Sequence, residues 1–145
     1  MEETIPGDRV VGRTKHGVLR VDDLAEIAPG MAELMDAFAR RYWTLYYAAK
    51  GGNWELARYE WREGRKLLEA STNTRPKYAD DVRAFLAGPY VIVGAALDAG
   101  DWASVERSYH AAIRESDRYR EKWAKPFIRF RLPARPPDGL DLGPG

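Results

Sequence analysis

Glu106 and His110 are the two residues whose types and spacing are most suited to acid–base chemistry. The chain has 145 residues and two histidines, and only His110 falls in a predicted helix. A spacing of four residues puts both side chains on one helix face, where they could transfer a proton or bind a metal ion. We favour the simpler interpretation of a surface or partly buried histidine. A di-iron helical protein would need two Glu-x-x-His segments, and the sequence has none. We therefore predict no metal site.

The composition excludes several classes of chemistry. The chain has no cysteine, which excludes disulfides, thiolate metal sites, cysteine nucleophiles and cofactors attached through thioether bonds. Its 23 basic and 22 acidic residues nearly cancel, so no overall field favours a nucleic acid or a membrane as the main partner. Residues 107–135 are the exception, with nine Lys or Arg and three Asp or Glu. This segment could contact phosphates or an acidic partner. We favour its neutralisation by the acidic N-terminal helices, within the fold or across a dimer.

Hydrophobic periodicity predicts the elements that position these residues. Residues 1–21 are rich in turn formers, and we expect an arm that lies on the surface, with a short extended piece at 18–21. Asp22 or Asp23 can cap a short helix that stops near Pro29. Apolar residues then recur at three- and four-residue steps. This pattern predicts helices over 31–50, 54–71, 78–99 and 102–123, with a loop over 71–76 and a kink or a break at Pro89.

Two similar turns join these helices in pairs. The order Gly52-Asn53-Trp54 returns 48 positions later as Gly100-Asp101-Trp102. In each turn the glycine ends one helix, the Asn or Asp caps the next, and the tryptophan packs over the junction. Short connections force antiparallel neighbours, so we predict two helical hairpins, 31–72 and 78–124, in an all-α, up-down-up-down four-helix bundle. A tetratricopeptide-like solenoid is the rival, but its period is about 34 residues and it needs about three repeats.

We predict one domain in three parts, which are an N-terminal arm (1–21), the bundle (22–125) and a C-terminal tail (126–145). The tail should lie extended on the bundle, because its apolar residues need cover while its prolines prevent a helix. These apolar residues are Phe127, Ile128, Phe130 and Leu132. We expect the last eight or so residues to be loose.

The sequence also bears on membranes and on the compartment. The most apolar run, 84–100, contains a proline and is too short to span a bilayer, so we expect it to be a buried helix. The first residues include no apolar stretch of signal-peptide length. This indicates a cytoplasmic protein as the sequence is written, or a periplasmic one if a leader has been removed.

Three segments share a resemblance to a known family. They are RYWTLYYA at 41–48, GNWELARYE at 52–60 with Glu63 after it, and PFIRFRLPARPP at 126–137. Together they resemble small bacterial proteins related to c-type cytochromes, over residues from about 31 to 137. In that family a four-helix bundle carries a haem-attachment motif, CxxCH, near the end of its last helix. The motif would fall at 116–120, where both cysteines and the histidine are missing, and Tyr42 stands where the family often has a histidine. The resemblance implies a relative without covalent haem, because the iron would lack both its anchor and its axial bond.

The resemblance also suggests pocket residues. Glu60 and Glu63 flank positions predicted to face a neighbouring helix, and Arg41 stands next to Tyr42. Either Glu60 and Arg41 form a structural ion pair, or these side chains line a polar pocket where haem sits in relatives, with Gly64 giving room. The candidate pocket residues are Arg41, Tyr42, Tyr46, Glu60, Glu63, Gly64 and His110.

Three functional hypotheses follow. We favour a non-enzymatic bundle without a cofactor that acts through contact with an unknown protein partner. We expect a homodimer through the first two helices, because their aromatic residues cannot all face inward; these are Trp43, Tyr46, Tyr47 and Tyr59. The alternative is a small-ligand pocket inside the bundle, including one for non-covalent haem with His110 or a tyrosine at the iron. The third hypothesis is an acid–base enzyme that uses Glu106 and His110.

Overall fold

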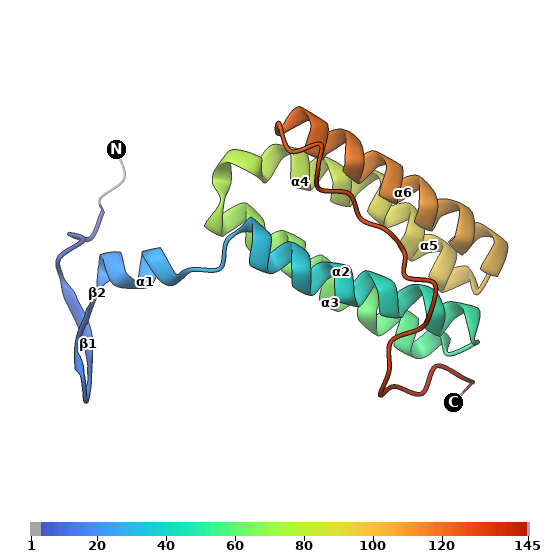
Figure 1. Ribbon diagram of the computed structural model, residues 1–145, viewed down its shortest axis with the longest axis horizontal. Coiled ribbons are helices and arrows are strands. Elements are labelled where there is room, and N and C mark those ends of the chain that lie inside the picture. The colour runs from blue at the N-terminus through green and yellow to red at the C-terminus, as the bar shows by residue number, and fades with distance from the viewer. Residues whose placement is uncertain (1–3, 145) are drawn as a thin grey trace.

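The computed structural model describes residues 4–144, and most of them are helical (Figure 1). The all-α class is therefore confirmed, apart from one small two-stranded sheet that we did not predict. The strands are β1 (Val10–Thr14) and β2 (Gly17–Arg20). The helices are α1 (Val21–Ile27), α2 (Met31–Lys50), α3 (Trp54–Thr74), α4 (Ala79–Phe85), α5 (Val91–Ala99) and α6 (Trp102–Lys122). Two short elements, η1 (Pro76–Tyr78) and η2 (Leu86–Tyr90), precede and follow α4.

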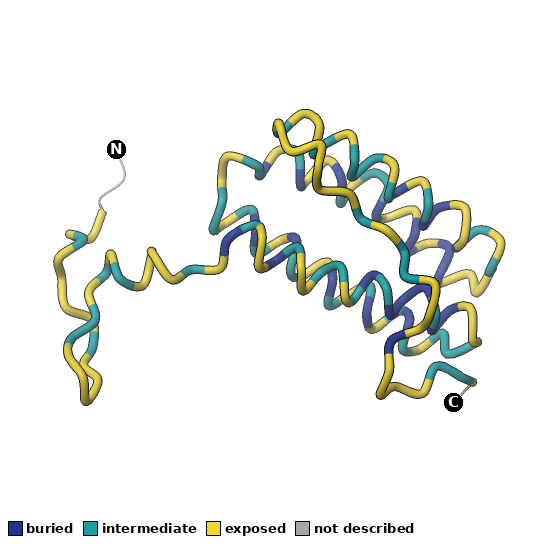
Figure 2. The backbone as a smooth tube through the Cα atoms, in the orientation of Figure 1, coloured by how far each residue is buried: buried dark blue, intermediate teal, exposed yellow. Residues whose placement is uncertain are grey.

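The N-terminal arm consists of the β1–β2 hairpin and α1, and it stands away from the other helices (Figure 1). We predicted an arm on the surface and a bundle that begins at residue 22. Instead α1 belongs to the arm, because the amides of Val21 and Asp22 donate hydrogen bonds to carbonyls of residues 9 and 7. None of the described arm residues before Gly30 is buried (Figure 2), and Ile27 is 71% exposed. Asp22 and Asp23 lie inside α1, whose N-cap residue is Arg20.

Both predicted turns lie between antiparallel helices. Gly52 has a φ of 87° and Gly100 a φ of 63°, left-handed values that favour glycine. After the first turn, the side chain of Asn53 accepts a hydrogen bond from the amide of Leu56. After the second, the carboxylate of Asp101 accepts one from the Ser104 hydroxyl instead of an amide. The first-turn tryptophans Trp54 and Trp102 are half-buried and pack against the core.

Two predictions about helix ends need correction. The loop expected at 71–76 is short, because α3 continues to Thr74. The hydroxyls of Ser71 and Thr72 donate to carbonyls three residues earlier and so are satisfied within the helix. The predicted break at Pro89 takes the form of the π-helical turn η2, a wider turn that suits a residue with no amide hydrogen to donate.

The apolar run in the middle of the chain is less buried than we expected. The helical stretch Pro76–Ala99 has 24 residues, so by length and composition alone it could cross a membrane. Only 39% of its most apolar window is buried. One side of α5 packs inward through Val93 and Leu97, whereas Val91 and Ile92 are exposed. The helix is therefore a core element on one face only.

Two reciprocal aromatic pairs join the α2–α3 hairpin to the elements that follow it. In the first pair, the rings of Tyr42 (α2) and Tyr109 (α6) stack with centroids 3.9 Å apart. Each hydroxyl donates to the backbone carbonyl of the other residue, at 2.8 and 2.9 Å. In the second pair, Trp61 (α3) stacks on Tyr90 (η2) with centroids 5.0 Å apart. Here too the indole N–H and the hydroxyl donate to each other's carbonyls, at 3.0 and 2.6 Å.

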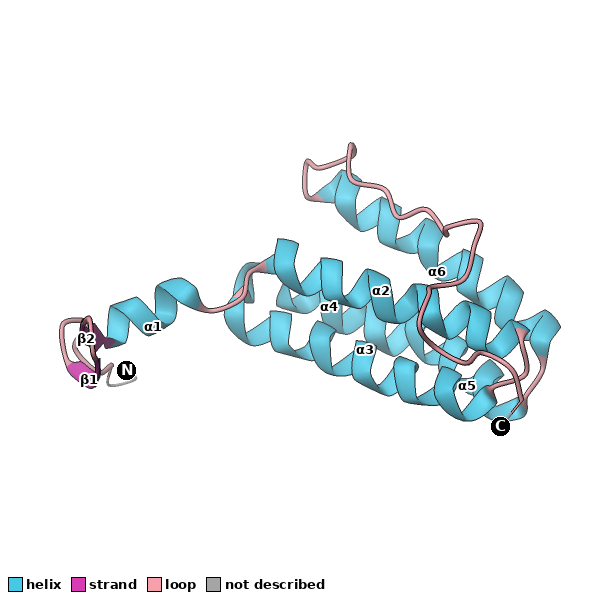
Figure 3. Ribbon diagram, turned by 60° about the horizontal axis from the view of Figure 1, so that its bottom comes forward, coloured by secondary structure: helices cyan, strands magenta, loops and turns pink. Residues whose placement is uncertain are grey.

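The C-terminal tail runs extended along the helices as an irregular chain (Figure 3). Side chains of the α2–α3 hairpin hold its backbone. The indole N–H of Trp43 donates to the carbonyl of Arg135 at 2.8 Å, and the Tyr47 hydroxyl donates to that of Pro133 at 2.6 Å. We expected the last eight residues to be loose, but the Asn53 amide also donates to the carbonyl of Asp141. The tail is therefore docked almost to its end.

The second aromatic pair generates a stability prediction at Gly64. A Cβ added there would lie 2.7 Å from the Tyr90 hydroxyl oxygen, which its bond to Trp61 holds in place. We expect Gly64→Ala to lower the free energy of unfolding by about 1–3 kcal/mol. The loss should be smaller in a Tyr90→Phe background, where the oxygen is gone. Urea unfolding of the two single variants and the double variant measures this coupling. Additive losses would contradict the proposed contact.

Candidate functional site

A cavity of about 70 Å³ lies between α2, α4, α6 and the C-terminal tail. Its walls are mainly apolar, and six of the lining residues are aromatic: Phe38, Tyr42, Phe85, Tyr119, Trp123 and Phe130. Two small side chains, Ala39 of α2 and Ala112 of α6, also face it. Each alanine stands three residues along its helix from a bulky tyrosine, and its short side chain leaves space between α2 and α6. Tyr42 and Tyr109 stack one turn away from these alanines.

Arg120 is the positively charged residue in the wall of this cavity. Its side chain is only 16% exposed, and burial lowers the pKa of its guanidinium. A guanidinium has five N–H donors. Among the described residues its one hydrogen bond is to the Ser116 hydroxyl, at 3.3 Å. The carboxylate of Asp117 is 3.8 Å away, which is an ion pair but not a hydrogen bond. Arg120 is thus a half-buried cation whose donors are mostly unused by described residues.

The neighbouring acidic residues are not equivalent. Asp81 also lines the cavity, and both of its oxygens accept short bonds, from Lys122 at 2.6 Å and from the Trp123 indole at 2.8 Å. These bonds lower the pKa of Asp81, so it is a fixed anion that joins α4 to the end of α6. In contrast, Oδ1 of Asp117 is buried and accepts no hydrogen bond from any described residue. Asp81 is therefore part of the wall, whereas Arg120 and Asp117 are incompletely paired.

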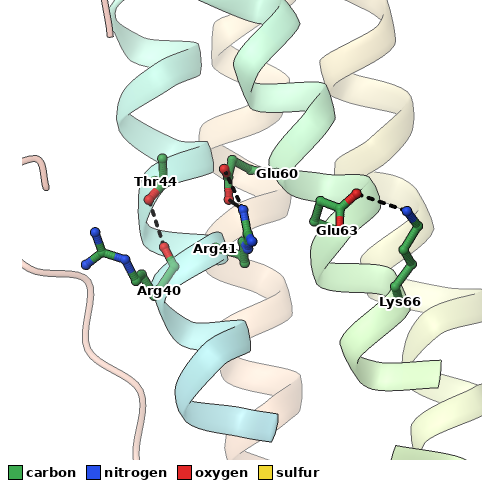
Figure 4. A network of polar contacts seen from close by, with 6 residues as sticks. All are labelled: Arg40, Arg41, Thr44, Glu60, Glu63 and Lys66. Carbon is green, nitrogen blue, oxygen red and sulfur yellow. Dashed lines mark hydrogen bonds and ion pairs between the residues drawn. The ribbon is translucent and has the colours of Figure 1, made fainter. Parts of the chain in front are cut away.

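The predicted pocket residues do not gather at this cavity. Arg41 and Glu60 form an ion pair between α2 and α3, with Arg41 Nη1 at 3.1 and 3.3 Å from the two carboxylate oxygens (Figure 4). Burial raises the pKa of Glu60, and Arg41 opposes that shift. Glu63 turns away and pairs with Lys66 at 3.0 Å (Figure 4). This arrangement fits the structural interpretation of the Glu60–Arg41 pair.

The remaining predicted pocket residues, Tyr42, Tyr46, Gly64 and His110, do not lie together at one site. Of the seven predicted pocket residues, only Tyr42 lines the cavity. Tyr46 packs against Trp102 and His110, with ring centroids 5.1 and 6.0 Å apart. The space beside Gly64 is occupied by Tyr90 and Phe38 and gives no room for a ligand.

Sequence reasoning missed Arg120 as a site residue. The available signal was a charged residue at an inward-facing position of the last helix. Steps of three and four residues from Trp102 through Tyr109 and Ser116 lead to either Tyr119 or Arg120. The structure places both of these side chains at the cavity.

The cavity does not fit haem. Ser116, Tyr119 and Arg120 stand where the resemblance places the two cysteines and the histidine, and no histidine lines the cavity. A volume of 70 Å³ is about half of the ~150 Å³ that holds benzene in an engineered protein, and a porphyrin is much larger. No group of three or more metal-binding side chains occurs among the described residues.

Comparisons with protein-family models, curated proteins and solved structures gave no match to this chain. The cytochrome-like relationship therefore stays a prediction, supported by the three sequence segments alone.

The Glu60–Arg41 pair generates a pH prediction. Because the pKa of Glu60 is raised in the folded state, the folded protein holds this proton to a higher pH than the unfolded chain does. The contribution of Glu60 to stability is thus greatest at low pH and falls as the pH rises through the folded-state pKa. Relative to Glu60→Gln, the wild-type free energy of unfolding should decrease as the pH rises from the ordinary carboxyl pKa of 4.5 through the raised pKa of Glu60. Urea unfolding at several pH values measures the difference. If the difference in free energy of unfolding between the wild type and Glu60→Gln grows with pH, Arg41 stabilises the charged carboxylate by more than its burial costs.

Proposed function

We propose that the protein is a non-enzymatic, up-down-up-down four-helix bundle that binds a small ligand in the cavity between α2, α4, α6 and the tail. The observation that supports this most strongly is a mainly apolar cavity whose wall includes a half-buried cation, Arg120, with unused hydrogen-bond donors. Ligand sites typically combine apolar walls with a few polar groups that fix orientation. The cytochrome-like scaffold is part of this proposal, with a smaller ligand in place of haem.

Energetics support a ligand over a packing defect. Protein interiors are close-packed, so side chains around a space that nothing fills lose packing contacts. Half-burying a cation without full hydrogen bonding adds a further cost. A ligand that fills the cavity and bonds to Arg120 would remove both costs at once.

Xenon provides a direct test of whether the cavity accepts a ligand, because dry apolar cavities bind it. Under xenon pressure, the methyl resonances of Leu68, Val82 and Ile113, which line the cavity, should shift in ¹³C spectra. Val18 in the arm should not shift. Ala39→Leu fills the cavity and should abolish the shifts. Ala37→Leu, at an exposed position of the same helix, is the matched control and should retain them. Unshifted wild-type resonances, or equal shifts in Ala39→Leu, would reject the site.

Exposed apolar residues on α5 support a second candidate function, which is self-association. Val91 is 48% and Ile92 58% exposed, and Ala95 and Ala99 extend the same face. The dimer we predicted through the first two helices is less favoured, because the tail covers Trp43 and Tyr47.

The partner that we propose for the α5 face is a second copy of the chain. Asp98, Arg58 and Arg62 border this face on the α3 side, and Arg107 borders it on the α6 side. In a two-fold pair with parallel α5 helices, Asp98 of one copy would face the Arg107 edge of the other.

Sedimentation velocity tests the dimer. We expect a dimer for the wild type and a monomer for Ile92→Lys, which places a charge in the centre of the α5 face. Ile27→Lys, at the exposed end of α1, is the control and should remain dimeric. A wild type that is monomeric over a wide concentration range would exclude this function. Dissociation of the Ile27 variant alone would place the interface on the arm instead.

A further inference from the structure

We propose that the ligand of this cavity is a short aliphatic monocarboxylate, with its carboxylate on Arg120 and its hydrocarbon among the aromatic walls. This inference rests on the ligand-binding function proposed above and names the chemical class of the ligand. Three properties of the site support it, which are the donors of Arg120, the charge around the cavity and the size of the cavity.

The donors of Arg120 suit a carboxylate. A guanidinium presents a planar fork of N–H groups that matches the two oxygens of a carboxylate. Ser116 occupies one nitrogen at 3.3 Å, and its own hydroxyl donates to the carbonyl of Ile113. Asp117, at 3.8 Å, leaves the guanidinium without a second hydrogen bond. The fork is therefore available and lies at the wall of an apolar cavity, where an ionic hydrogen bond is stronger than in water.

The surrounding charge favours an anion. Asp81 is the acidic residue in the wall, and Lys122 neutralises it directly, with Nζ of the lysine 2.6 Å from Oδ1 of the aspartate. The carboxylate of Asp117 partly neutralises the charge of Arg120. Beyond these two pairs, residues 107–135 carry seven Lys or Arg against two Asp or Glu. An anion entering the cavity would move into this positive field, whereas a cation would be repelled by it.

The volume limits the hydrocarbon to a short chain. One water-sized probe needs about 10–15 Å³ by this measure, so 70 Å³ holds only about five to seven of them. A chain of three to five carbons fits these limits, whereas a benzene ring does not. The walls offer aromatic faces and no unbonded acidic oxygen, so the non-polar end of the ligand would be aliphatic.

Isothermal titration calorimetry with isobutyrate and its neutral analogue isobutyramide tests the ligand class. The two probes have nearly the same shape and differ in charge. We expect the wild type to bind isobutyrate at least ten-fold more tightly than isobutyramide. Arg120→Gln should lose that preference and still show the xenon shifts. Arg118→Gln removes the same charge from a 76% exposed side chain of α6 and should bind isobutyrate as the wild type does.

A second measurement uses the unmodified protein and covers the case in which Arg120→Gln does not fold. In ¹⁵N spectra, isobutyrate should shift the Nε–H resonance of Arg120 and leave that of Arg118 unchanged. Equal affinity for isobutyrate and isobutyramide, or an unshifted Arg120, would overturn the carboxylate assignment. If the xenon shifts are present at the same time, the cavity remains a ligand site of another class. Absent xenon shifts would instead reject the proposed function itself.

Discussion

The two reciprocal aromatic pairs are the constraint on which the rest of the structure depends. In each pair the rings stack, and each polar tip donates to the backbone carbonyl of the partner residue, as at Tyr42 and Tyr109. Displacing either helix by one turn would break both bonds and leave buried donors without acceptors. Glycines give the second pair its space, because a Cβ at Gly94 would lie 2.7 Å from the Trp61 ring. The pairs therefore fix both the register and the spacing of the helices they join.

The cavity follows from that fixed spacing. The stacked rings of Tyr42 and Tyr109 set the distance between α2 and α6, and the alanines one turn away are too short to fill it. The tail closes the space with Phe130, whose ring meets the edge of Tyr42 with centroids 5.9 Å apart. Hydrogen bonds from Trp43 and Tyr47 to the tail backbone hold that cover in place. A rigid frame prevents the walls from collapsing, so the cavity and the half-buried Arg120 persist together.

Local signals in the sequence predicted the helices and their turns, whereas the site depends on contacts between distant residues. Gly52-Asn53 and Gly100-Asp101 could be interpreted from the sequence because a left-handed glycine and a capping side chain act within a few residues. The β1–β2 hairpin was missed because its Lys15-His16 turn lacks the usual Asn-Gly signal. Gly64 was expected to give room to a ligand, but Tyr90, 26 positions later, occupies that space. Arg120 could be placed on an inward stripe, but not beside a cavity that Phe130 of the tail completes.

A crystal structure of the protein with isobutyrate would show directly whether a carboxylate binds Arg120 inside the cavity. We expect density for the acid between α2, α4 and α6, with its carboxylate within hydrogen-bonding distance of the Arg120 guanidinium and its methyl groups against Phe38, Phe85 or Phe130. An empty cavity at saturating isobutyrate, or an acid bound with its carboxylate away from Arg120, would show that Arg120 does not hold a carboxylate here.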